Sequence, residues 1–389
     1  MIKRDDMTFS MKEYERRLSE LRSRMKERLL DAVIITDPGN ILYLTDYQTT
    51  GYSYFQAIVV PIEGEPVMVT RKLEESNVFA RTWVEKTSPY EDTGDAIQTL
   101  FDCLKDMNIL DKHIAFERNS YFFPAYQQAR LHSAFGDRFI YDCYGIVEQS
   151  RLCKSKEEIE VLKKAAKATE AGMKAGIAAC KPGVSENEIA AEISAAMFKA
   201  GGEFPAVMPY VTTGPRTMIG HATWEGRKLK EGEHAFLEVG GCYRRYHTAM
   251  MRTVVCGELS DSMYKAQEVM KRALGAVHEY FRPGLTVSDA NAIVRDIIMD
   301  NDIGATLCTR AGYSLGIAFP PSWDEGSIIS LNPGDFRPLQ EGMVFHVIPW
   351  MWGIDGDKTA GISDTIQITK DGCKSFFKTD RDFTVVKSK

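Results

Sequence analysis

The chain has 389 residues, of which 44% are hydrophobic and 26% charged, and its formal net charge is −6. This length predicts two domains, and the composition is typical of a globular protein with a buried core. The acidic balance offers no basic face, so nucleic acid is excluded as an expected partner. Because no run of about 18 apolar residues occurs, we expect neither a membrane span nor a membrane partner.

The start of the chain and its cysteines indicate where the protein works. Residues 1–15 are charged and lack the apolar core of a signal peptide. The eight cysteines form no Cys-x-x-Cys pair, so structural zinc is not expected. Reduced thiols then favour a cytoplasmic location.

The first third of the chain alternates between helical and strand patterns. Helices are predicted over residues 14–30 and 95–107, and strands over residues 31–36, 57–60, 66–70 and 114–117. Asp37-Pro38-Gly39-Asn40 predicts a turn that ends the first strand. Such alternation predicts an α/β N-terminal domain. We place the domains at residues 1–152 and 153–389.

Two similar helix-turn-helix segments lie about a hundred residues apart. Ser155 with Glu158 is a capping box that begins a long helix, and Ser185 with Glu188 begins the next one. Between the two helices stands Lys181-Pro182-Gly183-Val184-Ser185, which is echoed by Arg282-Pro283-Gly284-Leu285-Thr286. The echo predicts a duplicated helix-helix-sheet unit, with a site possible between its halves.

Three C-terminal segments resemble the creatinase/aminopeptidase P, or pita-bread, superfamily. They are residues 229–253 with Phe236-Leu237-Glu238-Val239-Gly240-Gly241, then Gly312-Tyr313-Ser314-Leu315-Gly316, and lastly residues 339–349 followed by Ile362-Ser363-Asp364-Thr365. Their order and spacing match over residues 155–375. The resemblance implies an α/β N-terminal domain and an α+β pita-bread domain with internal pseudo-duplication, assembled as a homodimer.

The metal ligands of that superfamily are missing here. In its metal-dependent members, two Asp, one His and two Glu at fixed places bind two divalent ions. The corresponding positions here hold Glu238, Ala249, Tyr313, Ile348 and Ser363. A dinuclear site needs several carboxylates to hold two cations close together, and only Glu238 remains. We therefore expect no metal and no other cofactor.

A metal-free branch, the ectoine hydrolases, is similar at four strings. These are Gly220-His221-Ala222-Thr223-Trp224, the run from Glu238 to His247, Phe319-Pro320-Pro321-Ser322-Trp323, and Met343-Val344-Phe345-His346. The chain departs from that branch at Gly361, where ectoine hydrolases carry Glu, and in the loop of residues 49–54. The resemblance implies hydrolysis of a C–N bond in a small zwitterion, with ring opening of ectoine to N-acetyl-2,4-diaminobutyrate as the specific reaction.

The resemblance also implies roles for individual residues. Glu238 is the predicted nucleophile or general base, and His221 the predicted proton donor. Alternation along a strand places His346 on the same side as Ile348. The residues predicted to bind substrate are His346, His247, Tyr313, Arg310 for a substrate carboxylate, and Tyr52 from a neighbouring subunit.

Several alternatives remain open from the sequence. Glu238 could instead be structural, as the salt-bridge partner of Arg244 or Arg252. His247 and His346 could likewise be core histidines whose hydrogen bonds are satisfied inside the protein. Asp324 and Glu325 read as solvated loop residues. Other substrates are a creatine-like guanidino acid or another cyclic amidine, and a non-catalytic binding protein is the alternative outside the enzymes.

Overall fold

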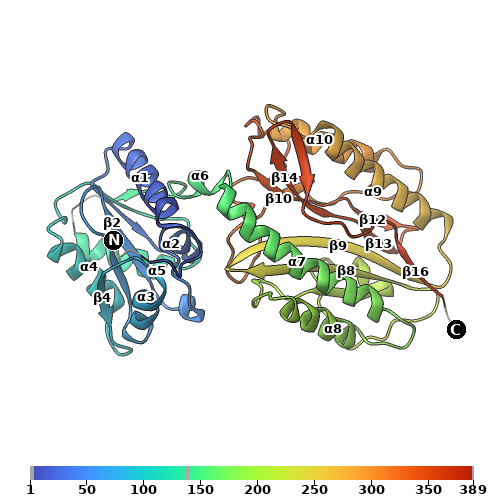
Figure 1. Cartoon of the computed structure of the whole chain (residues 1–389), viewed down its shortest axis with the longest axis horizontal. Coiled ribbons are helices and arrows are strands. Elements are labelled where there is room, and N and C mark those ends of the chain that lie inside the picture. The colour runs from blue at the N-terminus through green and yellow to red at the C-terminus, as the bar shows by residue number, and fades with distance from the viewer. Residues whose placement is uncertain (1–3, 137, 139, 388–389) are drawn as a thin grey trace. The chain divides into compact units, whose positions relative to one another are not determined.

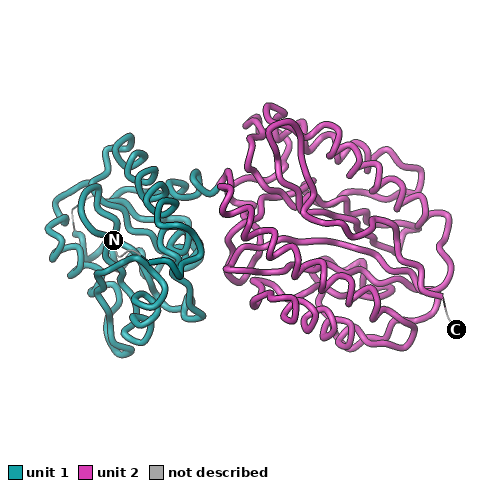
Figure 2. Tube along the Cα trace, viewed as in Figure 1, with its two compact units in different colours: residues 1–151 teal, residues 152–389 magenta. Residues whose placement is uncertain are grey.

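The computed structural model describes residues 4–136, 138 and 140–387. The chain divides into two compact units, Met1–Arg151 and Leu152–Lys389 (Figure 2). Among the described residues, no helix is long and apolar enough to cross a membrane.

The N-terminal unit is a mixed sheet with helices. Its strands follow the order β4-β3-β2-β1-β5-β6, in which β1 pairs with β2 antiparallel and with β5 parallel. The strands are β1 Ala32–Ile35, β2 Ala57–Pro61, β3 Val67–Arg71, β4 Lys86–Tyr90, β5 Ile114–Phe116 and β6 Tyr141–Asp142. The helices are α1 Met11–Glu27, α2 Pro38–Thr45, η1 Thr50–Ser53, η2 Lys72–Glu74, α3 Glu75–Arg81, α4 Ala96–Asp106, α5 Ala125–Phe135 and α6 Glu148–Arg151.

One local prediction in this unit is wrong. Asp37-Pro38-Gly39-Asn40 begins helix α2 instead of forming a turn between strands. The Asp37 carboxylate accepts hydrogen bonds from the backbone N–H groups of Gly39 and Asn40, and Pro38 stands at the first helical position. Asp at the N-cap and Pro at N1 are as typical of a helix start as of a turn, and the apolar residues that follow decide for the helix.

In the C-terminal unit two pairs of helices accompany the strands. Figure 1 shows α7 running across β8 and β9, with α8 below these strands and α9 and α10 above them in the view. The helices are α7 Lys156–Ala179, α8 Glu186–Lys199, η3 Gly214–Met218, α9 Asp261–Tyr280 and α10 Val287–Met299. The strands are β7 Tyr210–Thr213, β8 His234–Tyr243, β9 Tyr246–Cys256, β10 Gly312–Ser314, β11 Val344–Val347, β12 Trp350–Ile354, β13 Lys358–Gly361, β14 Asp364–Thr369, β15 Gly372–Ser375 and β16 Thr384–Val386.

These strands are divided among separate sheets. One sheet has the order β16-β9-β8-β7, a second has the order β10-β11-β14-β15, and β12 pairs with β13. Strands β8 and β9 form the longest hairpin and are buried along almost their whole length. The predicted capping boxes of α7 and α8 are confirmed, with both reciprocal hydrogen bonds present in each.

The predicted duplication appears as matching backbone contacts in the two halves. After α7, the N–H of Gly183 donates to the carbonyl of Leu229 at 2.8 Å. After α9, the N–H of Gly284 donates to the carbonyl of Leu339 at 2.9 Å. Both glycines adopt a φ near +90°, a conformation that only glycine adopts at little cost. Each half therefore fastens its Pro-Gly turn to the segment that leads into a central strand.

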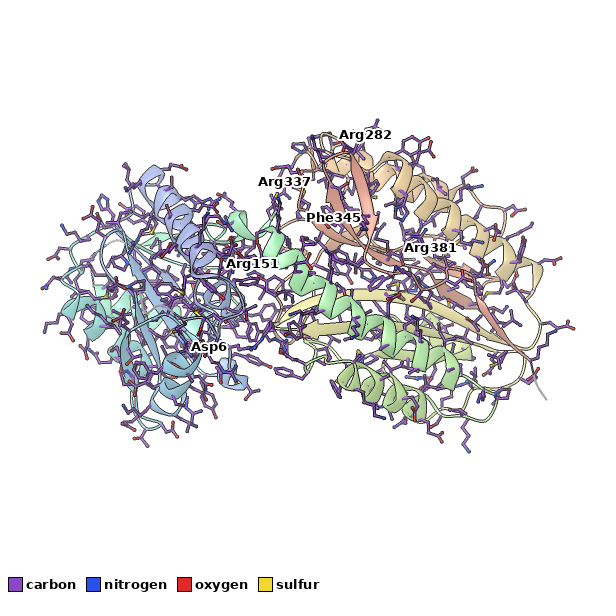
Figure 3. All side chains as sticks on the ribbon, viewed as in Figure 1. Asp6, Arg151, Arg282, Arg337, Phe345 and Arg381 are labelled. Carbon is purple, nitrogen blue, oxygen red and sulfur yellow. The ribbon has the colours of Figure 1, made fainter. Side chains whose placement is uncertain are left out.

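A buried ion pair joins these strands to the C-terminal segment. Arg252 on β9 and Asp364 on β14 are 2% and 1% exposed and lie 3.0 Å apart, and Asp364 also pairs with Arg381, which Figure 3 labels. The Arg252 guanidinium donates further hydrogen bonds to the carbonyls of Met251, Ser363, Thr379 and Asp380. Its charge is thus fully paired inside the protein.

Replacing Arg252 with Met should therefore destabilise the protein strongly. Two buried and two part-buried carbonyls lose their donor, and Asp364 loses one of its two arginine partners, which costs about 3–5 kcal/mol of unfolding free energy. Urea denaturation of the wild type and the variant measures the difference. Lys265→Met, which removes an exposed pair with Asp302, is the control and should cost about 1 kcal/mol or less. Equal losses in both variants would contradict the assignment.

Candidate active site

The C-terminal unit contains a cavity of about 720 Å³. Strands β7, β8, β9, β10 and β12 each contribute a residue to its wall, and loops supply the rest. The lining residues are Val207, Tyr210, His221, Glu238, Met251, Thr309, Arg310, Tyr313, Pro321, Ser322, Trp323, Asp324, Asn332, Ile348 and Trp350. Aromatic rings thus surround one buried acid and one arginine, which is the composition expected of a small-molecule site.

Glu238 is the buried acid of this cavity. It lies in the middle of β8, in register with Tyr210 on β7 and Met251 on β9, and is 4% exposed. Within the described part of the chain, its carboxyl group has neither a hydrogen-bond partner nor an ion-pair partner. Burial alone raises the pKa of Glu238 to about 8, because desolvation disfavours the charged form. The alternative of a salt bridge to Arg252 is wrong, since Arg252 pairs with Asp364.

Strand alternation explains why this carboxyl faces the cavity. Leu237 and Val239 belong to the hydrophobic core that includes residues of α7 and α8. Glu238 and Gly240 therefore point to the opposite face. A side chain at Gly240 would collide with the ring of Trp323, so glycine at this position lets the indole approach the strand. The sequence of β8 thus fixes both the acid and the aromatic wall beside it.

His221 lies in the loop after η3 and is exposed. Its φ of 57° lies in the left-handed region, which is uncommon for residues other than glycine, although Asn, Asp and His adopt it more often than most. The imidazole ring lies 5.7 Å from the ring of Tyr210, which in turn meets Trp323 edge-on at 5.6 Å. Both predicted catalytic residues, His221 and Glu238, therefore lie in the wall of one cavity.

Arg310 supplies the positive charge of the site. Its guanidinium stacks over the ring of Tyr313 at 4.7 Å and lies 3.7 Å from the carboxylate of Asp324. Among the described residues, its Nε has no hydrogen-bond acceptor. The guanidinium is thus a cationic group in the cavity wall, with Asp324 beside it and a buried Nε that no described residue satisfies.

His346 lies behind the cavity wall and does not line it. The side chain is fully buried, with Nδ1 2.9 Å from the hydroxyl of Tyr313 and Nε2 2.6 Å from the hydroxyl of Ser363. Burial lowers the pKa of His346 to about 3, so the ring is neutral. The predicted contact of His346 with substrate is therefore wrong. Its hydrogen bond instead holds Tyr313, which lines the cavity.

His247 also lies outside the cavity wall, while the predicted contact of Tyr52 with the pocket of a neighbouring subunit stays a prediction. His247 is fully buried, accepts a hydrogen bond at Nε2 from the backbone N–H of Ala206, and contacts the carbonyl of Arg245 with Nδ1. Burial lowers its pKa well below the ordinary value. Both ring nitrogens are thus bonded to backbone groups, so His247 has a structural role. The predicted contact of His247 with substrate is wrong. Tyr52 belongs to η1 of the N-terminal unit, where its ring meets Phe122 edge-on at 5.9 Å.

Comparison with known proteins identifies the family. Residues 160–370 match metallopeptidase family M24, and residues 17–153 match the creatinase/prolidase N-terminal domain. The chain belongs to family M24. The predicted fold, an α/β domain followed by a pita-bread domain, is thereby confirmed.

Curated relatives of this M24 protein extend over its full length. An ectoine hydrolase of Halomonas elongata is 30% identical over 392 residues, covering 95% of this chain and 96% of the relative. An uncharacterized hydrolase/peptidase of Sinorhizobium fredii is 28% identical over 390 residues, covering 97% and 98%. The protein is accordingly a hydrolase of the M24 and creatinase type.

Solved structures show the same fold. A prolidase from Pyrococcus horikoshii OT3 superimposes with a TM-score of 0.82 at 21% identity, covering 95% of this chain and 99% of the other. A dipeptidase from Mycobacterium ulcerans also gives 0.82, at 24% identity and with 98% and 100% covered. At these identities the likeness establishes the architecture and leaves the reaction to the residues of the cavity.

Those residues do not fit the two-metal centre that the family name implies. Of the five ligand positions, Glu238, Tyr313 and Ile348 line the cavity, while Ala249 and Ser363 are buried beside it. Among the described residues, no group of three or more His, Cys, Asp or Glu side chains is placed to hold a metal ion. One carboxylate cannot hold two divalent cations, so we derive no chemical step through a metal.

Some residues of the site were missed from the sequence. Tyr210 and Trp350 line the cavity, but each occurs in a short apolar segment without a recognisable motif. Glu325, interpreted as a solvated loop residue, is 3% exposed and lies 2.7 Å from the ammonium group of Lys154. Its other oxygen accepts from the N–H of Ile317, so this pair fixes the loop that carries Trp323.

The burial of Glu238 predicts a specific dependence of stability on pH. The raised pKa means that the folded state binds this proton more tightly than the unfolded state, so stability falls as pH rises from about 4.5 through about 8. Glu238→Gln cannot titrate. The variant should therefore have a stability close to that of the wild type at pH 5 and exceed it by about 4–5 kcal/mol at pH 9, measured by urea denaturation.

Glu233→Gln is the matched control for this experiment. A hydrogen bond from Arg227 lowers the pKa of Glu233, so its contribution to stability is present at neutral pH and lost as pH falls. The two variants should consequently change relative to the wild type in opposite directions. A constant difference between Glu238→Gln and the wild type across the pH range would contradict the burial of an unpaired acid.

Proposed function

We propose that this M24 protein hydrolyses a C–N bond in a small zwitterionic compound without a metal ion, and that its reaction is ring opening of ectoine to N-acetyl-2,4-diaminobutyrate. The observation that carries the proposal is Glu238, a buried acid without a protein partner in a cavity that also holds His221 and Arg310. A cavity wall that holds this acid and the guanidinium of Arg310 suits a ligand with one charge of each sign. The likeness to the Halomonas elongata ectoine hydrolase supports the specific substrate.

The chemistry of the ligand matches these groups. Ectoine is a cyclic amidine with a carboxylate, and its amidinium carbon is an electrophile between two nitrogens. The carboxylate binds Arg310, and the amidinium charge stabilises the ionised form of Glu238 because opposite charges lower the pKa of an acid. The surrounding aromatic rings add favourable cation–π contacts to a delocalised cation.

Hydrolysis then needs one addition and one bond cleavage. Glu238 removes a proton from water as the water oxygen bonds to the amidine carbon, or attacks that carbon itself before water releases it. His221 delivers a proton to the ring nitrogen as its C–N bond breaks. The second hydrogen of the water passes to the released nitrogen, so the products are an amide and an ammonium group on one open chain, and no redox change occurs.

One feature of the structure favours a second substrate class. Ectoine hydrolases carry Glu at the position of Gly361, and here a methyl group at Gly361 would lie 2.7 Å from Cε2 of Phe236. Phe236 stacks against Trp350 of the cavity wall with ring centroids 5.4 Å apart. Packing at this point leaves no room for the missing acid. A creatine-like guanidino acid or another cyclic amidine is therefore the alternative substrate.

The proposal is tested by turnover with and without metal. We expect chelator-treated protein to convert ectoine, and not creatine, to an open-chain product detected by mass spectrometry, with hydroxyectoine as a third substrate. Glu238→Gln should lose turnover by at least about 1000-fold, because it removes the base or nucleophile. Activity that appears only after a divalent metal is added would contradict the proposal, and binding of ectoine without turnover would indicate a non-catalytic protein.

The pH profile of kcat/KM gives a second test. Only the ionised form of Glu238 is active in this scheme, and kcat/KM reports the free enzyme, in which the pKa is about 8. On the acid side of the profile, kcat/KM should rise about tenfold per pH unit as the ionised fraction of Glu238 increases. A profile that is flat between pH 5.5 and 8 would show that Glu238 does not act as a base or nucleophile.

A further inference from the structure

Tyr313 lies at the end of a chain of hydrogen bonds that leads out of the protein core into the cavity. Its hydroxyl oxygen lies 3.0 Å from Nε1 of Trp323 and 2.9 Å from Nδ1 of His346. On the other side of the imidazole, Nε2 lies 2.6 Å from Oγ of Ser363, which accepts a hydrogen bond from the N–H of Met251 at 2.7 Å. Strand pairing sets this order, since Tyr313 on β10 and Thr365 on β14 both stand opposite His346 on β11. Phe345, the residue before His346, is labelled in Figure 3.

The inner end of the chain fixes the position of one proton. Ser363 is fully buried, and among the described residues its hydroxyl contacts only the N–H of Met251 and Nε2 of His346. The Met251 N–H is a donor, so the hydroxyl hydrogen of Ser363 has only Nε2 as an acceptor. Nε2 therefore carries no hydrogen. In the reverse arrangement, Nε2–H would donate to Ser363 and leave the buried serine hydrogen without an acceptor, which is unfavourable.

The position of that proton determines the rest of the chain. His346 is neutral, because burial lowers its pKa to about 3, so its single ring hydrogen resides on Nδ1. Nδ1–H then donates to the oxygen of Tyr313, and the indole N–H of Trp323, which can only donate, does the same. The phenol oxygen thus accepts two hydrogen bonds. Among the described residues, neither of these two neighbours can accept the phenol's own hydrogen, because both are donors. That hydrogen is therefore left for the cavity that Tyr313 lines.

We propose that Tyr313 is a catalytic residue whose phenol donates a hydrogen bond to the oxygen that becomes attached to the substrate carbon. This inference rests on the proposed hydrolysis and assigns a further group to the same site. As the water oxygen bonds to the amidine carbon, its proton goes to Glu238 and the oxygen gains the hydrogen bond from Tyr313. When the ring C–N bond breaks, the leaving nitrogen takes a proton from His221. The same oxygen becomes the carbonyl oxygen of the amide as its remaining hydrogen passes through water to the released amine, which becomes an ammonium group, and Glu238 returns its proton to His221 through solvent.

The phenol keeps its own proton throughout these steps. Burial and the nearby Glu238 raise the pKa of Tyr313 well above the ordinary value, so it acts as a donor without ionising. Two hydrogen bonds accepted by the oxygen polarise the O–H bond and strengthen the one that it donates. A fixed donor aimed at a reacting oxygen lowers the barrier because it needs no reorganisation. Tyr313 and Ser363 occupy two former ligand positions, so hydrogen bonding here takes over the polarisation of an oxygen that a metal ion provides elsewhere in the family.

The tautomer of His346 tests, without any substrate, whether the hydrogen bonds run from Ser363 through His346 to Tyr313. Two-bond ¹H–¹⁵N spectra of protein labelled with ¹⁵N-histidine distinguish a hydrogen on Nδ1 from one on Nε2. The loss of signals in His346→Asn assigns the residue. We expect the Nδ1–H tautomer from pH 6 to pH 9. The Nε2–H tautomer would overturn the inference, because Tyr313 would then donate to His346 and have no hydrogen for a substrate.

Kinetics of Tyr313→Phe test the catalytic role. The ring and the cavity shape remain, so we expect kcat for ectoine to fall about 100-fold or more while KM changes less than about threefold. Tyr90→Phe is the matched control, since it removes a buried phenol that donates to the carbonyl of Phe55 in the N-terminal unit, and its kcat should match the wild type.

The outcomes separate this inference from the proposed function. If wild-type protein hydrolyses ectoine and folded Tyr313→Phe keeps its kcat within threefold, the role of Tyr313 is overturned and the proposed function stands. If wild-type protein hydrolyses none of the three compounds, the proposed function fails and the inference that rests on it fails as well, whichever tautomer is found. If Tyr313→Phe fails to fold, two other measurements decide the role of Tyr313: the tautomer of His346, and kcat of Ser363→Ala compared with kcat of the wild type. Removing the serine frees Nε2 to take the hydrogen, so kcat should fall at least tenfold, and an unchanged kcat would overturn the inference.

Discussion

An unpaired carboxyl group in a buried strand is the constraint around which the cavity is organised. Glu238 lies between two other strands of its sheet, with a hydrophobic core behind it and the cavity in front. Desolvation favours its neutral form in the free protein, and no described side chain offsets that effect. In the proposed reaction, the positive charge of the substrate makes the ionised form of Glu238 favourable. Substrate binding would then also activate the acid, because opposite charges lower the pKa of a carboxyl group.

The fold has kept its architecture while changing the chemistry of its former ligand positions. Ala249 is held by Thr365, whose hydroxyl accepts from the backbone N–H of Ala249 and donates to its carbonyl. Ser363 and Tyr313 are joined through His346. Every polar group at these positions finds a partner within the protein or faces the cavity. At these five positions, which all lie in the described part of the chain, no donor is left unsatisfied in the core.

The strands that position the site are fixed by contacts remote from it. The Arg252–Asp364 pair joins β9 to β14, and both Pro-Gly turns are tied to the segments preceding central strands. The Lys154–Glu325 pair holds the loop that carries Trp323. Each of these contacts joins residues far apart in sequence. A cavity built from five strands and several loops keeps its shape because its supports are independent of the ligand.

Sequence alone determined the features that depend on near neighbours or on the family pattern. The capping boxes at Ser155 and Ser185, the Pro-Gly turns, the pita-bread fold and the placing of Glu238, His221, Arg310 and Tyr313 in one region all followed from local signals or matched motifs. Tertiary structure alone decided which polar groups have partners. Asp37 caps a helix, Glu325 is buried against Lys154, and His247 and His346 bind groups inside the protein. The physical reason is that a hydrogen bond or ion pair depends on distances between residues remote in the chain, and residue spacing carries no record of those distances.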